Sequence, residues 1–317
     1  DEPCAGPSET FTITVTPTAQ VNDLDNIVLC NDSDSTEIVF TTDNQNGTTL
    51  YTWTNNDTSI GLGSGGTGNI ASFNATNETT EPVTATITVT PAYDSTLDCE
   101  GPSKTFTITV NPTGQVDPLA SQVVCNADTT TVEFSTENTG GTTTYEWISS
   151  VDLGSGLAGT GDISFTAINT TTDLLVSTFT VTPTFTNGDE PCAGPSETFT
   201  ITVTPTAQVN QIDSQILCND EQTALILFTT ENTGGTTTYS WTNNTPSIGL
   251  DLTGDGDIEP FTAVNNGTSP VTASIEVTPS FEGCDGPTET FIITVNPTAE
   301  MVDPVNMVVC NAEVTDI

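Results

Sequence analysis

Apolar residues alternate with threonine in several short stretches of the chain, and the clearest example lies between residues 105 and 111. Phe106, Ile108 and Val110 occupy every second position there, with threonine between them. Alternation with a period of two places the apolar side chains on one face of a strand. We therefore predict a half-buried strand that stops at Pro112, because proline has no N–H to donate to a strand ladder.

Similar patterns predict further strands at residues 131–135, 145–147 and 176–181, and we expect the last of these to end at Pro183. The glycine-rich stretch 154–161 predicts a loop between strands, since no Gly-Lys-Ser/Thr follows it. No segment of useful length has helical periodicity, and β-branched residues dominate the sequence. These patterns predict an all-β protein.

The chain is built from repeats. Three marker residues recur at intervals of 92 to 95 residues: a cysteine before Gly-Pro (Cys4, Cys99, Cys192, Cys284), a cysteine before Asn (Cys30, Cys125, Cys218, Cys310) and a tryptophan (Trp53, Trp147, Trp241). Asp1–Asn22 is identical, residue for residue, to Asp189–Asn210. A repeat of this length is large enough to bury its own core, so we predict tandem domains.

The spacing predicts five parts, of which the outer two are incomplete. Residues 1–21 would be the last strand of a preceding domain, residues 22–115, 116–209 and 210–301 three complete repeats, and residues 302–317 the first strand of a following domain. We accordingly expect the chain to be a section of a longer polypeptide.

Each repeat is predicted to be an immunoglobulin-like (PKD-like) β-sandwich, and the array to be extended. About seven short strands with an aromatic residue in the third are typical of two packed sheets. We expect Trp53, Trp147 and Trp241 to be core residues, the alternative being a role in stacking against a ligand. Proline-rich linkers around Pro112, Pro118, Pro297 and Pro304 would hold successive domains in a semi-rigid row.

The charge balance excludes several classes of function. The sequence has 42 acidic residues, a single basic one, Lys104, and no histidine. Binding to nucleic acid or to an anionic membrane needs lysine and arginine, so neither is expected. No stretch is apolar enough to span a membrane. Histidine-dependent general acid–base and Ser-His-Asp chemistry is excluded, and we predict that the protein is not an enzyme.

Eight cysteines without Cys-x-x-Cys or histidine indicate disulfides rather than a zinc site. A bond between Cys99 and Cys125 would require the chain to fold back on itself. We therefore predict a bond within each repeat, from the first strand to the final hairpin: Cys30–Cys99, Cys125–Cys192 and Cys218–Cys284. Loops of this size are worth roughly 4 kcal/mol each in the chain-entropy model. Cys4 and Cys310 would pair with cysteines outside the sequence.

Hard oxygen ligands for calcium are present in the third repeat at Asp251, Asp255 and Asp257, and in the first at Asp32 and Asp34. These are weak candidates, because no cluster reaches the number of ligands that calcium needs. The alternative is that they are solvated residues of turns. We expect no cofactor other than this possible structural calcium.

The motif Cys-x-Gly-Pro followed by Thr-Phe-x-Ile-Thr-Val-x-Pro-Thr, then Val-x-Cys-Asn, with Tyr-x-Trp between, resembles the immunoglobulin/PKD-like tandem repeats of giant Bacteroidetes surface proteins. The gliding-motility adhesins of flavobacteria (SprB type) are examples. The resemblance implies export by the type IX system and an extracellular location at the cell surface, attached to the outer membrane through regions outside this sequence. It also implies O-glycosylation in Asp-Ser/Thr contexts, which occur at Ser35, Ser95 and Thr129.

Two functions agree with these features. The array is either a stalk or adhesin that projects from a bacterial cell for attachment or gliding, or a structural subunit of a bundled extracellular filament or sheath. Its partner would be a cell surface, a polysaccharide substratum or copies of itself. A bundling fibre should repeat an apolar surface patch once per unit, whereas a lone stalk should not.

Overall fold

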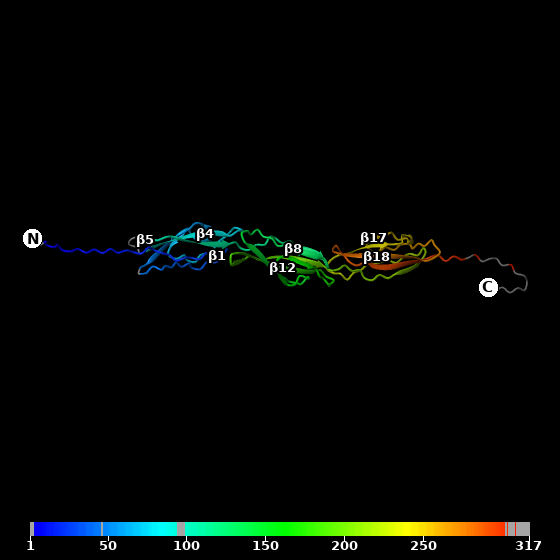
Figure 1. Cartoon of the computed structure of the whole chain (residues 1–317). Coiled ribbons are helices and arrows are strands. Elements are labelled where there is room, and N and C mark those ends of the chain that lie inside the picture. Colours follow the sequence, from blue (N-terminus) through cyan, green and yellow to red (C-terminus); the bar gives the residue numbers. More distant parts are fainter. Residues whose placement is uncertain (1–2, 46, 94–98, 302, 304–307, 309–317) are drawn as a thin grey trace. The chain divides into compact units, whose positions relative to one another are not determined.

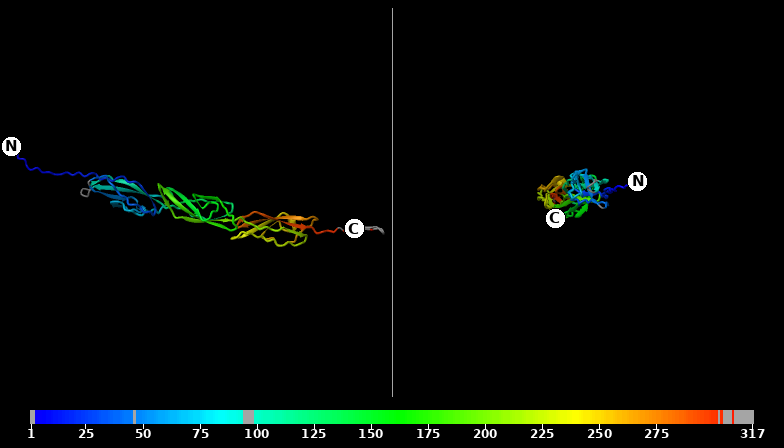
Figure 2. Two further views of the ribbon diagram at one scale, coloured as in Figure 1. Left: turned by 90° about the horizontal axis from the view of Figure 1, so that it is seen from below. Right: turned by 90° about the vertical axis from the view of Figure 1, so that its left-hand side faces the viewer.

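The computed structural model describes residues 3–45, 47–93, 99–301, 303 and 308. Its regular structure is almost entirely strands, and the prediction of an all-β fold is confirmed. Each six-stranded sheet takes its strands from a single repeat. Figures 1 and 2 show these strands in blue to cyan for the first repeat, green for the second and yellow to orange for the third. We call the three bodies the first, second and third sandwich.

The first sandwich has one complete sheet in the order β1-β6-β4-β2-β3, with β5 paired to β4. Its elements are β1 (Ile27–Cys30), β2 (Thr49–Asn55), the 3₁₀ turn η1 (Thr58–Ile60), β3 (Gly65–Thr67), β4 (Val83–Tyr93), β5 (Cys99–Glu100) and β6 (Lys104–Asn111). The first strand runs parallel to the last, and the other pairs are antiparallel. The opposing layer is held by bridges such as Ile38 to Ile70.

The second sandwich repeats this order as β10-β9-β12-β14-β7, with β13 paired to β12. Its strands are β7 (Gln122–Cys125), β8 (Thr129–Val132), β9 (Thr142–Ser149), β10 (Ala158–Thr160), β11 (Ile163–Thr166), β12 (Leu175–Asn187), β13 (Glu190–Ala193) and β14 (Glu197–Thr204). Strands β8 and β11 form a second, two-stranded sheet.

The third sandwich again has the order β15-β20-β18-β16-β17, with β19 paired to β18. Its elements are β15 (Gln215–Cys218), β16 (Thr237–Asn243), η2 (Pro246–Ile248), β17 (Thr253–Asp255), β18 (Val271–Phe281), β19 (Cys284–Asp285) and β20 (Glu289–Asn296). A sheet in which the first strand joins the last in parallel, with the long strand and the tryptophan strand beyond, has the strand order of immunoglobulin-like sandwiches.

Two local predictions were wrong. Pro183 does not end its strand, because β12 continues to Asn187. Proline is tolerated there since its carbonyl oxygen, rather than an N–H, is used: it accepts a bond of 2.9 Å from the N–H of Gly194. The glycine-rich stretch 154–161 is also not wholly a loop, because it contains β10.

The prediction that the three tryptophans are core residues is confirmed, since each is no more than 8% exposed. Each lies directly across the sheet from a glycine: Trp53 from Gly66, Trp147 from Gly159 and Trp241 from Gly254. A Cβ atom at these glycines would lie 2.1 to 2.7 Å from the indole ring. The glycines therefore make the room that the ring occupies, and any larger residue would push it out of the core.

The chain divides into two compact units, and the division passes through the second sandwich rather than between sandwiches. One unit is Asp1–Ser121, Thr130–Phe165 and Ser177–Thr200, and the other is Gln122–Thr129, Thr166–Val176 and Ile201–Ile317. The first unit therefore contains the contacts between the first and second sandwiches, and the second unit those between the second and third. We call these the first and second junctions.

Candidate functional site at the junctions between repeats

Two disulfides link neighbouring sandwiches. Cys30 is bonded to Cys192 and Cys125 to Cys284, with Cα atoms 5.4 and 5.6 Å apart. The predicted bonds within repeats, Cys30–Cys99, Cys125–Cys192 and Cys218–Cys284, are therefore wrong. Each bond instead joins the last residue of the first strand of one sandwich to the hairpin of the next.

The direction of the first strand explains the error. Because β1 runs parallel to β6, Cys30 lies opposite Asn111, at the end of β6. Cys99 belongs to the hairpin that precedes the start of β6 at Lys104. At about 3.3 Å per residue, the length of β6 separates the two cysteines by roughly 23 Å along the strand. A disulfide needs Cα atoms within about 7 Å, so a bond inside the repeat is impossible.

At the first junction, a long hairpin reaches the preceding sandwich. Strand β12 and β13 pair as far as Asn187 and Glu190. The side chain of Asn111, which is fully buried, donates from Nδ2 to the carbonyl oxygens of these two residues, at 3.0 and 3.3 Å. These two hydrogen bonds fix the hairpin beside the strand end that carries the disulfide.

At the second junction the hairpin is short. It turns at Glu282 and Gly283, directly after β18, and Cys284 follows at once. The residue that corresponds to Asn111 is Thr204, and its buried hydroxyl has no hydrogen-bond partner within the described part of the chain. The disulfide therefore forms here without the polar contact that accompanies it at the first junction.

A backbone hydrogen bond recurs at both junctions. The N–H of Thr139 donates to the carbonyl of Thr80 at 2.9 Å, and the N–H of Thr233 to the carbonyl of Thr172 at 3.0 Å. The donors lie in corresponding turns of the later sandwich, and the acceptors follow corresponding buried asparagines, Asn77 and Asn169, of the earlier one. Each junction thus has this backbone hydrogen bond in addition to its disulfide.

The linker before each sandwich is clamped to that sandwich by an asparagine. Asn138 accepts from the N–H of Gln115 at 2.8 Å and donates to the carbonyl of Thr113 at 3.3 Å. Asn44 and Asn232 make the same pair of bonds in the other repeats. The sequence signal was an asparagine four residues after a phenylalanine in each repeat.

The glycine of Cys-x-Gly-Pro lies on the other side of this linker. A Cβ atom at Gly194 would be 1.7 Å from the carbonyl oxygen of Gly114, and the same clash, at 1.8 and 1.9 Å, would occur at Gly101 and Gly286. Because the obstacle is backbone, no side-chain rotation relieves it. The motif therefore keeps glycine so that the linker can lie against the hairpin that holds the disulfide.

Three described cysteines are free: Cys4, Cys99 and Cys218. We had expected Cys4 and Cys310 to be the cysteines without partners in the sequence. The observed pairing instead leaves Cys99 unpaired, on a hairpin, and Cys218 unpaired, at the end of β15. Cys310 lies outside the described residues.

The described ionisable side chains include an ion pair and several groups with shifted pKa values. Lys104 pairs with Asp23. Burial raises the pKa of Tyr51, Tyr145 and Tyr239. The hydroxyl and backbone N–H of Ser59 both bind Asp57 and lower the pKa of its carboxyl.

The calcium candidates are not brought together. The described residues contain no group of three or more His, Cys, Asp or Glu side chains that could hold a metal ion. Asp257 accepts from the N–H of Phe228 at 2.8 Å, as Asp162 does from Phe134 and Asn69 from Phe40. The position is therefore occupied by a side-chain oxygen that fixes the opposing layer, which explains why Asp and Asn both serve there.

The three glycosylation candidates have different outcomes. Ser35 is 6% exposed, and its hydroxyl accepts from the N–H of Phe73 at 3.0 Å, so the folded protein does not present it to a transferase. Ser95 lies outside the described residues. Thr129 is exposed at the start of β8, and its modification stays a prediction.

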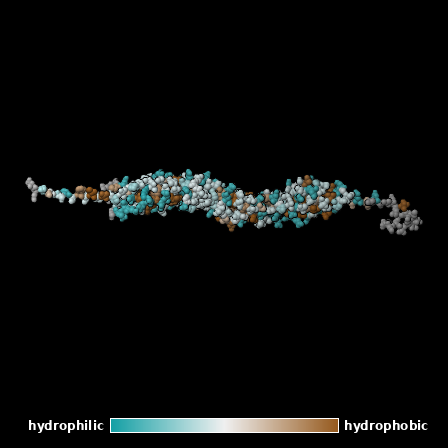
Figure 3. Space-filling view, viewed as in Figure 1, coloured by the Kyte–Doolittle hydropathy of each residue, from teal (hydrophilic) through white to brown (hydrophobic). Residues whose placement is uncertain are grey.

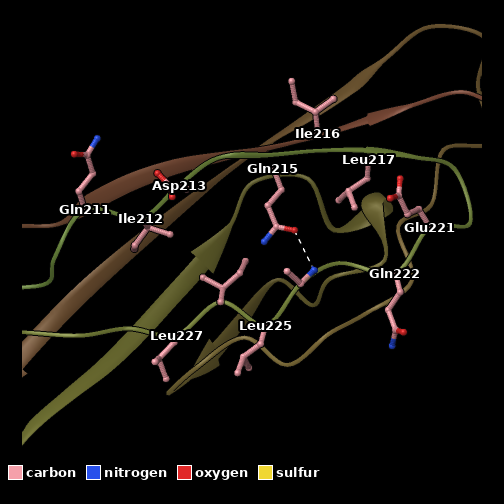
Figure 4. A pocket seen from close by; sticks show the side chains of 12 residues that line it. Gln211, Ile212, Asp213, Gln215, Ile216, Leu217, Glu221, Gln222, Leu225 and Leu227 are labelled. Atoms are coloured by element: carbon pink, nitrogen blue, oxygen red, sulfur yellow. Dashed lines mark hydrogen bonds between the residues drawn. The ribbon is translucent and has the colours of Figure 1, made fainter.

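A surface groove lies on the third sandwich between residues 211–217 and 221–227. Figure 4 shows Gln215 extending across it, where its side-chain oxygen accepts from the N–H of Ala224 at 3.2 Å. Leu225 and Leu227 line it and are 51% and 59% exposed. The corresponding residues are Glu37 and Val39 in the first repeat and Thr131 and Glu133 in the second. This pair of leucines is thus present in one repeat only.

No helix among the described residues is long and apolar enough to cross a membrane. No protein-family model matches the chain, and no curated protein matches it.

Among solved structures, the chain is similar to multi-domain fragments of other proteins. Mouse cadherin-23 (EC22-24) is 13% identical with a TM-score of 0.33, covering 89% of this chain and 99% of the other. An I-band fragment of titin is 8% identical with a TM-score of 0.43, covering 89% and 97%. Extracellular domains 3-5 of Drosophila OTK are 10% identical with a TM-score of 0.32, covering 89% and 97%. At these levels the likenesses bear on neither partner nor function, and the architecture rests on the strand pairing itself.

Proposed function

We propose that the chain is a non-enzymatic, extracellular, adhesion-type repeat protein whose sandwiches serve as covalently braced spacers. The observation that carries this proposal is the pair of disulfides that tie each described sandwich to the next. Disulfides persist in oxidising surroundings, which supports a location outside the cytoplasm. A covalent brace between domains suits an array that bears tension.

The more specific role is a stalk or adhesin fibre on a bacterial cell, used for attachment or gliding. Its support is the resemblance of the repeat motif to surface proteins of Bacteroidetes. Attachment to an outer membrane and binding to a polysaccharide substratum rest on the same resemblance and on no contact in the structure.

The surface supports a single-file array over a bundled filament. Among the described residues, no large apolar residue is exposed at the same place in all three repeats. Val123 and Ile216 are 70% and 74% exposed, but Val28, at the corresponding position of the first repeat, is half-buried. On the face that Figure 3 shows, hydrophobic residues of the sandwiches form scattered spots among polar ones. A formal net charge of −41 also opposes side-by-side packing of copies.

Single-molecule stretching tests the brace. With both disulfides intact, the shortest covalent path between the chain ends runs through residues 1–30, 125–192 and 284–317. At about 3.3 Å per residue this path is roughly 430 Å long, against roughly 1050 Å for the whole chain. We expect complete unfolding to release less than half the length under oxidising conditions that it releases after reduction.

Matched variants make the stretching test specific. Cys284→Ser removes one brace and should give an intermediate length, as should Cys192→Ser. Equal lengths before and after reduction would show that the disulfides do not brace the sandwiches. The proposed role in bearing tension would then be wrong.

Sedimentation and surface binding separate the spacer from its alternatives. We expect the chain to stay monomeric at physiological salt and to show no retention on polysaccharide-coated beads. Reversible self-association, weakened by Ile216→Glu, would favour the bundled filament. Retention on the beads would make the repeats a binding module rather than a spacer.

A further inference from the structure

The free cysteines occupy the same positions as the bonded ones. Cys30 and Cys125, the strand-end partners, are the last residues of β1 and β7, and Cys218 is the last residue of β15. Cys192 and Cys284, the hairpin partners, lie opposite Phe185 and Phe281, and Cys99 lies opposite Tyr93 in the same way. Cys99 is therefore a hairpin half of the same bond, without its strand-end half.

The surroundings of Cys99 show where that missing half belongs. Its Sγ atom lies 3.1 Å from the hydroxyl oxygen of Thr16. Glu9–Thr16 has the same sequence as β14, in which Thr204 corresponds to Thr16. Thr204 is the register partner of the strand-end residue Cys125. A strand laid beside residues 13–16 as β7 lies beside β14 would therefore bring its last residue, a cysteine, next to Cys99.

The apolar face of this segment is bare. Phe11, Ile13 and Val15 are 86%, 78% and 85% exposed. The identical residues of β14, Phe199, Ile201 and Val203, are at most 3% exposed. Three large side chains in alternation, buried in one copy of a sequence and exposed in the other, mark a last strand that has no sandwich to complete.

We propose that residues 9–16 together with Cys99 form a docking site for a repeat of the same kind as residues 116–188. Residues 9–16 would complete its sheet as the last strand, and its strand-end cysteine would bond to Cys99. This inference does not depend on the proposed function, since it concerns only how one repeat is attached to the next. By the same rule, Cys218 would bond to the hairpin cysteine of a further repeat.

The bond forms by thiol–disulfide exchange. The thiolate of one cysteine attacks a small-molecule disulfide such as oxidised glutathione and releases one thiol. The second cysteine then attacks the mixed disulfide and releases the other. The two protein thiols lose two electrons and two protons, and the oxidant gains them as two molecules of reduced thiol.

The identity of Asp1–Asn22 and Asp189–Asn210 allows a direct test. Joining residues 116–188 in front of Asp1 of the full chain completes a copy of the second repeat without any change at the join. After oxidation in a glutathione redox buffer, non-reducing peptide mapping should link the added copy of Cys125 to Cys99. Hydrogen exchange at residues 9–16 should slow by at least 100-fold relative to the unextended chain.

Two controls complete the experiment. With Cys125→Ser in the added copy, residues 9–16 should remain protected while Cys99 becomes reactive to a thiol reagent. A link from the added Cys125 to Cys4 would overturn the proposed pairing, because it would place the bond inside one repeat. Unprotected residues 9–16 would overturn the docking itself, whatever the cysteines do.

Discussion

The two junctions carry the same covalent bond in different surroundings. Both link a strand end to a hairpin over similar sequence separations, 162 and 159 residues, and both have the backbone bond from Thr139 or Thr233. The first adds a long hairpin and the buried amide of Asn111, whereas the second has a two-residue turn and an unpaired hydroxyl at Thr204.

Comparing the two junctions shows which features the disulfide link requires and which can vary. The link needs a first strand parallel to the last, so that its final residue reaches the far end of the sheet, and a glycine that lets the linker lie close. It tolerates a change of four residues in hairpin length, because the cysteine keeps its place opposite Phe185 or Phe281 while the added residues extend the turn beyond it.

Removing the disulfides should have the largest effect. Closing a loop of about 160 residues is worth roughly 5 kcal/mol in the chain-entropy model, so Cys192→Ser and Cys284→Ser should each cost about that much. Denaturant unfolding followed by tryptophan fluorescence measures both losses. Since the two loops are almost equal in size, a difference between the variants would report unequal contacts in the folded junctions.

The connectivity itself has a separate check. Non-reducing peptide mapping should recover the peptide that holds Cys125 linked to the one that holds Cys284. A link from Cys125 to Cys192 would restore the pairing expected from the sequence and contradict the parallel register of β7 and β14.

Replacing the hairpin glycine should have the next largest effect. In Gly194→Ala the new Cβ meets the carbonyl oxygen of Gly114, and we expect a loss of about 3 kcal/mol in unfolding free energy, at the upper end for overpacking. Gly6→Ala is the matched control: it has the same sequence context, but nothing lies within 4 Å of its Cβ position, so it should cost almost nothing. A similar loss in both variants would mean that the linker does not lie against the hairpin.

The sequence predicted the architecture because the architecture depends on local pattern. Alternation at residues 105–111, the recurring tryptophan and the repeat interval were enough for the sandwich and its core. It failed on connectivity because the pairing of β1 with β6 joins residues about 80 apart, and no local pattern specifies whether that pairing is parallel. Recognising Cys30 as the end, rather than the start, of a strand parallel to the last one would have excluded Cys99 as its partner.

The functional residues of the junction were missed for a related reason. Gly194 and Asn138 resemble ordinary turn residues, and only the path of the linker between them explains why each repeat keeps them. The short motif at Ser35 says nothing of burial, so the sequence alone could not show that this residue is buried. For Gly194 and Asn138 the sequence showed only that the residue recurs at a fixed position of each repeat. Recurrence indicates that the residue is needed there, but not which contact requires it.

Replacing Asn111 or Thr204, the last residues of β6 and β14, should have a smaller effect. Asn111→Thr removes the donor to the carbonyls of Asn187 and Glu190 and should cost about 1 to 2 kcal/mol. Thr204→Val removes a buried hydroxyl without a partner in the described structure and should be neutral or stabilising by about 1 kcal/mol. Calorimetry on both variants tests whether the first junction gains from its amide. A larger loss for Thr204→Val than for Asn111→Thr would reverse the comparison.

The smallest expected effect lies two residues after the strand-end cysteine. The chain adopts positive φ there in each repeat: 60° at Asp32, 71° at Ala127 and 65° at Asp220. Aspartate tolerates this left-handed region better than alanine, because its short polar side chain can bond locally. The second junction therefore carries a small strain that the first largely avoids.

Ala127→Gly should remove that strain and stabilise the protein by about 0.5 to 1 kcal/mol, since glycine enters positive φ without a steric penalty. Asp32→Gly, the matched change at the first junction, should gain less, because the residue it replaces is already suited to the conformation. Thermal unfolding of the two variants beside the parent measures the difference. If Asp32→Gly stabilises more than Ala127→Gly, the left-handed turn is not what distinguishes the two strand ends, and the contrast between the junctions reduces to hairpin length and the buried amide.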